Sequence, residues 1–142
     1  MSECICHVEL KEVLHTGSDI GDDWVFSIEV DGVRRSIDMR GTGRTEDRVT
    51  FARRLRWTTY GHPCGSVMSV GVTVAATEKD LVFDDHGEGG GTFLVACPGP
   101  GGAPRVYPGQ EIVIRVEERP LGDAMVHWVT FVFELTTICE AQ

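Results

Sequence analysis

No stretch of this 142-residue sequence is apolar for long enough to cross a bilayer as a helix. The most apolar part, Met125 to Leu135, is interrupted by polar and charged side chains. The first residues, Met1 to Cys4, contain a glutamate and lack the apolar core of a secretion signal. We therefore expect a cytoplasmic address, with the membrane periphery included.

Motifs of familiar enzymes are also missing. The sequence has no Gly-x-Ser-x-Gly elbow, no P-loop and no His-Glu-x-x-His pair. The glycine-rich runs at 87–91 and 99–102 do not open helices, so they do not form a phosphate cradle. We expect a protein that is not an enzyme. The alternative is a metal-dependent enzyme that uses acidic loops together with His86.

Basic residues are few and unevenly placed. The chain has 13 Lys and Arg against 22 Asp and Glu, which gives a net charge of −9. Such a charge disfavours nucleic-acid binding, because phosphate backbones repel it. Most of the basic residues are arginines between Arg34 and Arg56, whereas residues 57–104 contain only Lys79. The sequence therefore predicts one basic strand region and one acidic loop region.

Cysteine is present five times, at positions 4, 6, 64, 97 and 139. An odd count without a secretion signal favours reduced thiols. A disulfide between Cys4 and Cys139 is the alternative, because terminal strands often pair in sandwiches.

Alternation of apolar and polar residues is the main structural signal. It is clearest in Trp24 to Val30, which precedes the hairpin dipeptide Asp31-Gly32. The last strand should place Val129, Phe131, Phe133 and Leu135 in the core. The expected strands are 7–15, 24–30, 33–39, 49–60, 67–76, 92–97, 111–117 and 126–135. Short, regularly spaced strands predict one all-β domain over 1–142, a two-sheet antiparallel β-sandwich of about eight strands.

Carboxylates concentrate in two predicted loops. They are Asp19, Asp22 and Asp23 in the first loop, and Glu78, Asp80, Asp84 and Asp85 in the second. Calcium takes six to eight oxygen ligands from carboxylates, carbonyls and water. If the two loops meet, they form a candidate calcium site. Alternatively, they are solvated turns on an acidic sandwich.

The order of these parts resembles a C2 domain. Gly21-Asp22-Asp23-Trp24-Val25 lies where that family has its first ligand loop, and Glu78-Lys79-Asp80 followed by Asp84-Asp85 lies where it has its third. Gly91-Thr92-Phe93 then opens the next strand, and Arg53-Arg54-Leu55-Arg56 matches an Arg/Lys-rich middle strand. Glu78 stands where Asp is usual. The resemblance implies a C2-like fold and calcium-dependent docking to anionic lipid or to a protein partner.

The arginine cluster is the candidate contact surface for that lipid or partner. Its members are Arg34, Arg35, Arg53, Arg54 and Arg56. Guanidinium groups bind phosphate and carboxylate well. Alternatively, these arginines form a solvated face. A further alternative function is a structural or assembly protein that forms oligomers without metal, through exposed aromatic residues Trp24, Trp57 and Tyr60.

Overall fold

The computed structural model describes residues 2–16, 24–38, 48–78, 85–118 and 125–141. These residues form eight β-strands. They are β1 (Ser2–Thr16), β2 (Trp24–Val30), β3 (Val33–Asp38), β4 (Arg48–Pro63), β5 (Val67–Glu78), β6 (Asp85–Ala96), β7 (Arg105–Glu118) and β8 (Met125–Ala141). Within the described ranges there is no helix long and apolar enough to cross a membrane.

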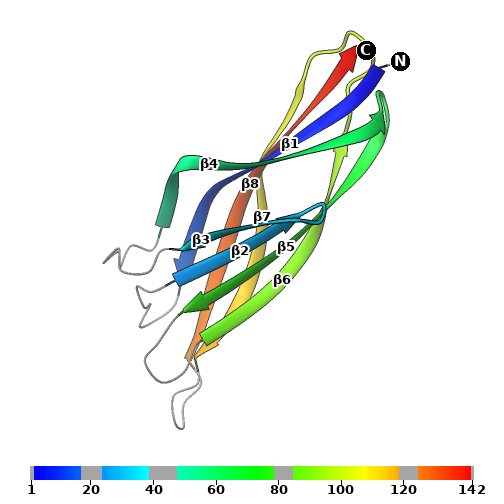
Figure 1. Cartoon of the computed structure of the whole chain (residues 1–142). Helices are drawn as coiled ribbons and strands as arrows, with labels where there is room; N and C mark the ends of the chain where they lie inside the picture. The colour runs from blue at the N-terminus through cyan, green and yellow to red at the C-terminus, as the bar shows by residue number, and fades with distance from the viewer. Residues whose placement is uncertain (1, 17–23, 39–47, 79–84, 119–124, 142) are drawn as a thin grey trace.

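The strands form two antiparallel layers (Figure 1). The first sheet has the order β3-β2-β5-β6, and the second has the order β7-β8-β1-β4. A single bridge between His86 and Glu117 joins the sheets at β6 and β7. This confirms the predicted all-β, two-sheet sandwich of eight strands.

The core lies between the two layers, and the predicted alternation fills it. Along β2 every second residue from Trp24 to Val30 is at most 2% exposed, and the predicted core residues of β8 are fully buried. Phe26 of the first sheet meets Phe131 of the second edge-to-face, with ring centroids 5.7 Å apart. Period-two patterning therefore determines which face of each strand is buried.

Two aromatic residues lie elsewhere than predicted. Trp24 and Trp57 are only 2% and 3% exposed, whereas Tyr60 is 64% exposed. The expectation that all three are exposed is wrong for the two tryptophans. A large indole contributes more free energy when buried between sheets than on the surface. The assembly hypothesis loses these two contact residues.

The sixth strand is longer than predicted, because it starts at Asp85 and not at Thr92. The glycine-rich segment belongs to the sheet because β6 passes close to β7. A Cβ on Gly89 would lie 2.7 Å from the Ile114 side chain, and one on Gly87 would overlap the Arg115 carbonyl oxygen. Glycine is needed here for close approach of two strands rather than for a turn.

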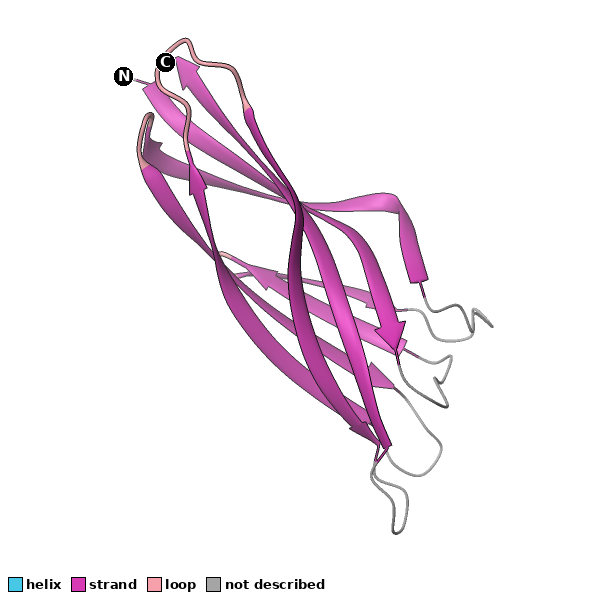
Figure 2. Cartoon of the chain, turned by 180° about the vertical axis from the view of Figure 1, so that it is seen from behind, coloured by secondary structure: helices cyan, strands magenta, loops and turns pink. Residues whose placement is uncertain are grey.

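Four cysteines form disulfides, Cys4 with Cys97 and Cys64 with Cys139, and only Cys6 is a free thiol. The prediction of reduced thiols is therefore wrong for four of the five. The alternative pair was wrong as well, since Cys4 and Cys139 are cross-strand neighbours but bond elsewhere. We call the end of the sandwich with the disulfides and both termini the clamped end (Figures 1 and 2).

Candidate functional site

The opposite end of the sandwich, which we call the acidic end, carries the attachment points of both acidic segments. Trp24, the first residue of β2, pairs with Glu78, the last residue of β5. Glu78 in turn pairs with Asp85, the first residue of β6. Neighbouring strands lie about 4.8 Å apart. Segments 17–23 and 79–84 therefore join the first sheet at adjacent strand ends.

Only two of the seven predicted metal ligands fall in the described part of the chain. Glu78 is partly buried, and the Asp85 backbone lies opposite it. The remaining five, Asp19, Asp22, Asp23, Asp80 and Asp84, lie outside the described residues. Within the described ranges, no three His, Cys, Asp or Glu side chains gather as a metal site would require. The structure thus brings the anchors of the two segments together and leaves the ligand set a prediction.

His86, the candidate nitrogen ligand, has other partners. Its Nδ1 is 2.8 Å from the Thr77 hydroxyl oxygen. Its Nε2 lies 3.5 Å from the Glu88 carboxylate. Both partners sit on the outer face of the first sheet, so the imidazole is engaged along that face.

The predicted arginine cluster spreads over one edge of the sandwich. Arg34 and Arg35 lie on β3 and Arg56 lies on β4, and all three are exposed. Arg53 and Arg54 belong to β4, but their side chains lie outside what the structure describes. Arg34 lies 3.8 Å from Glu29 on the first sheet, and Arg56 lies 3.9 Å from Glu9 on the second. These three arginines therefore do not form one flat patch.

Trp57 connects the two edge strands that carry these arginines. Its indole Nε1 donates a hydrogen bond of 2.9 Å to the Val33 carbonyl oxygen, which links β4 to β3. The Arg35 guanidinium lies over the indole, 5.7 Å from the ring centroid. This cation–π contact holds a positive charge at the edge where the two sheets meet.

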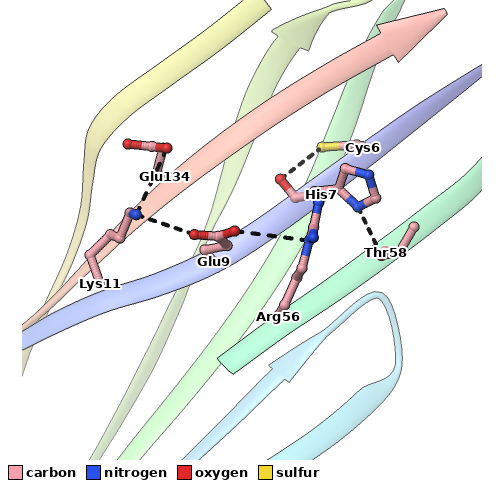
Figure 3. A network of polar contacts seen from close by, with 7 residues as sticks. All are labelled: Cys6, His7, Glu9, Lys11, Arg56, Thr58 and Glu134. Carbon is pink, nitrogen blue, oxygen red and sulfur yellow. Dashed lines mark hydrogen bonds and ion pairs between the residues drawn. The ribbon is translucent and has the colours of Figure 1, made fainter. Parts of the chain in front are cut away.

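A charged network crosses the outer face of the second sheet (Figure 3). Lys11 lies 3.2 Å from Glu9 and 3.9 Å from Glu134. His7 Nδ1 is 2.9 Å from the Thr58 hydroxyl oxygen. Partial burial and, to a smaller degree, the positive charge of Arg56 lower the pKa of His7. Arg56 therefore belongs to an intramolecular network as well as to the basic edge.

A groove that sequence reasoning missed lies on the outer face of the first sheet. Its volume is about 340 Å³. Its polar lining includes Ser27, Glu29, Arg34, Thr73 and Glu88. The sequence does contain a signal for the groove, the small residues at outward positions of β5 and β6. This signal can be recognised only when the strand register is known.

Comparison with solved structures finds proteins with a similar arrangement of strands. Human GIVD cytosolic phospholipase A2 aligns with 99% of this chain at 12% identity and a TM-score of 0.44, and the chain spans 16% of that protein. A C2 domain of plant Extended Synaptotagmin 1 aligns with 97% of this chain at 9% identity and a TM-score of 0.41, with 95% of that domain covered. No protein-family model matches the sequence, and no curated protein is significantly similar to it. At these identities and scores, the likeness assigns no ligand or activity to this chain.

Proposed function

We propose that this protein is a non-enzymatic, C2-like binding module that docks on an anionic membrane surface in a calcium-dependent manner. The observation that carries the proposal is the strand register Trp24–Glu78–Asp85. It anchors two carboxylate-rich segments, some sixty residues apart, on neighbouring strands at one end of one sheet. The cytoplasmic face of a membrane is the surface on which such a module would act.

Oxygen donors dominate the chemistry of these two segments. Calcium would be held by Asp19, Asp22, Asp23, Glu78, Asp80, Asp84 and Asp85. Hard divalent cations prefer such carboxylates, whereas imidazole favours transition metals. His86 is engaged with Thr77 and Glu88. The donor set therefore fits calcium better than zinc or copper.

Net charge supplies the reason for calcium dependence. A chain of net charge −9 is repelled by anionic lipid as a whole. Bound calcium would neutralise the acidic end and allow it to approach the membrane. The exposed arginines on β3 and β4 would add attraction to phosphate groups, which guanidinium binds in a bidentate manner.

Vesicle co-sedimentation tests this proposal. We expect binding to phosphatidylserine-containing vesicles with calcium, and loss of binding with EDTA or with pure phosphatidylcholine. The double variant Asp80→Asn, Asp84→Asn should abolish binding. Glu111→Gln, an exposed carboxylate on β7, is the control and should leave binding unchanged.

Two results would contradict parts of the proposal. Vesicle binding that is equal in calcium and EDTA would rule out the calcium dependence. Calcium binding without any vesicle association would rule out the membrane and leave an acidic protein partner as the target.

A charge-reduced edge tests the arginines separately. The double variant Arg34→Gln, Arg35→Gln should weaken vesicle binding without changing calcium affinity.

A further inference from the structure

The groove on the outer face of the first sheet is built from cross-strand rows of short side chains. One row runs across four strands through Arg34, Glu29, Thr73 and Gly90. The next runs through Ser36, Ser27, Ala75 and Glu88. Small residues on β5 and β6 leave the middle of these rows hollow. Longer charged side chains stand at both sides, from β2 and β3 on one side and from β6 on the other.

Two carboxylates line this hollow from different strands, Glu29 beside Arg34 and Glu88 beside His86. Glu29 on β2 and Glu88 on β6 are separated by one intervening strand and lie in neighbouring rows, so their backbones lie about 12 Å apart. The Thr73 hydroxyl donates to Glu29 over 3.3 Å, which holds that carboxylate toward the groove. Arg34 lies 3.8 Å from the same carboxylate and its side chain is 69% exposed. An exposed ion pair of this kind is weak, so an incoming cation can displace Arg34.

The lining excludes several ligand classes. No aromatic side chain among the described residues lines the groove, so a sugar ring or nucleobase has no surface to stack on. One arginine against two glutamates disfavours phosphate. The remaining lining residues, Val74, Ala75 and Gly89, are apolar. A ligand that fits has a short aliphatic stem and a cationic head.

We propose that this groove binds an alkylguanidinium or alkylammonium group, with its stem along Ala75 and its head between Glu29 and Glu88. The volume of about 340 Å³ is at the lower end for small-molecule sites, which suits a ligand the size of one arginine or lysine side chain. The ligand is a free amine or a basic residue of a partner segment. The proposal does not rest on the proposed function, because the groove needs neither calcium nor an anionic surface.

Titration of the ¹⁵N-labelled full chain in EDTA tests the groove. Agmatine, a small dication with one guanidinium and one ammonium group, is the free-amine probe. A capped tri-arginine peptide represents a partner segment, and N-acetyl-citrulline amide is a neutral near-isostere of an arginine side chain. We expect saturable shifts of the Ser27, Thr73, Ala75 and Gly89 amides with the cationic probes and none with the neutral probe. Either cationic source supports the proposal, and the ratio of the two affinities tells which is bound.

Variants locate the binding within the groove. Glu88→Gln should weaken agmatine binding about threefold to fivefold, as expected for one exposed charge pair. Ala75→Leu should abolish binding by filling the floor, with thermal unfolding used to check that the variant folds. Glu111→Gln on the other sheet should leave the affinity unchanged. Absence of saturable shifts at millimolar agmatine, equal shifts with the neutral probe, or equal losses in Glu88→Gln and Glu111→Gln would overturn the proposal.

Discussion

The two ends of the sandwich are held in different ways. At the clamped end, Cys4–Cys97 links β1 of the second sheet to the residue after β6 of the first, and Cys64–Cys139 links the β4–β5 connection to β8. The Tyr107 hydroxyl and the Thr137 hydroxyl also hydrogen-bond to Ala96. At the acidic end, the sequence offers carboxylates and no cysteine. One end is thus covalently joined, whereas the other is the end at which we propose that calcium binds.

This contrast indicates how the free energy of folding is distributed. The disulfides close long segments of 93 and 75 residues, which limits the unfolded chain. If the carboxylates of the two acidic segments gather as proposed, they have the opposite effect, because each pair at about 4 Å costs about 1 kcal/mol in water and more where solvent is partly excluded. Under the proposed function, the clamped end would compensate for an acidic end that becomes stable only when calcium binds.

Reduction of the disulfides should have the largest effect. Each bond is expected to contribute about 2–5 kcal/mol to the free energy of unfolding. Urea unfolding with and without dithiothreitol measures the loss, and the pairs Cys4→Ser with Cys97→Ser and Cys64→Ser with Cys139→Ser separate the two contributions. Unchanged unfolding midpoints after verified reduction would contradict the role of the clamped end.

Counting free thiols tests whether the two disulfides form in the cell. Disulfides are typical of oxidising compartments, whereas the N-terminal sequence predicts a cytoplasmic address, so the number of free thiols in the cell tests that prediction. Mass spectrometry of alkylated protein should find one free thiol. Cys6 is fully buried, and burial raises the pKa of its thiol to about 11. It should therefore react with iodoacetamide only after unfolding. Five thiols that react after unfolding, in protein isolated from its cells without a reductant, would contradict the disulfides and support the cytoplasmic prediction.

Calcium should stabilise the acidic end by a smaller amount. A ligand that binds only the folded state adds about 2.7 kcal/mol at one hundred times its Kd. We expect a higher melting temperature in calcium than in EDTA, and little shift in magnesium. Asp22→Asn should reduce the calcium shift and raise the melting temperature in EDTA, because one repulsive charge is removed. Equal melting temperatures in calcium and EDTA would leave the two acidic segments as solvated turns.

Because β6 packs closely on β7, we expect an added methyl group between them to lower the free energy of unfolding by about 1–3 kcal/mol. Gly87→Ala places a methyl group against the Arg115 carbonyl and the Val116 side chain, and the strands must separate. Gly71→Ala on β5 is the matched control, because a Cβ there meets nothing within 4 Å. Urea unfolding should show destabilisation in the first variant only. Equal free energies would mean that the strands move apart without cost.

Strand faces were readable from the sequence, and tertiary contacts were not. The alternation in Trp24 to Val30 predicted a buried face, because a pleated strand points successive side chains to opposite sides. The strand from Asp85 to Thr92 was missed because Gly89 and its neighbours have no strand propensity of their own. Their place in the sheet comes from the close approach of β7, which single-sequence patterning does not report.

The candidate site, too, was predictable in its residues and not in their arrangement. Carboxylate-rich segments stand out in the sequence, but their proximity depends on the strand order β2-β5-β6, which brings Trp24 and Glu78 side by side. The groove around Ser27 and Ala75 depends on register as well. Disulfide partners were unpredictable for a related reason, because Cys4 lies opposite Cys139 in the sheet and yet bonds to Cys97.

The smallest expected effect lies on the outer face of the second sheet, between the two ends. Burial and the charge of Arg56 lower the pKa of His7 below its usual value, although Glu9 and Glu140 act in the opposite direction. A histidine whose folded-state pKa is lowered binds protons more readily in the unfolded chain. Stability should therefore be constant above the unfolded pKa of about 6.5 and should fall as pH decreases through the lowered value.

His7→Gln tests this dependence, because glutamine keeps a polar group near Thr58 and does not titrate in this range. The variant should show a flatter dependence of the urea midpoint on pH between about 7 and 5 than the parent chain. Gly71→Ala, which removes no titratable group and meets nothing within 4 Å, is the control and should leave the slope unchanged. An equal slope in His7→Gln and the parent would assign the acid sensitivity to the carboxylates. Suppression of that slope by calcium would then assign it to the acidic end, whereas a slope that originates at His7 should not change with calcium.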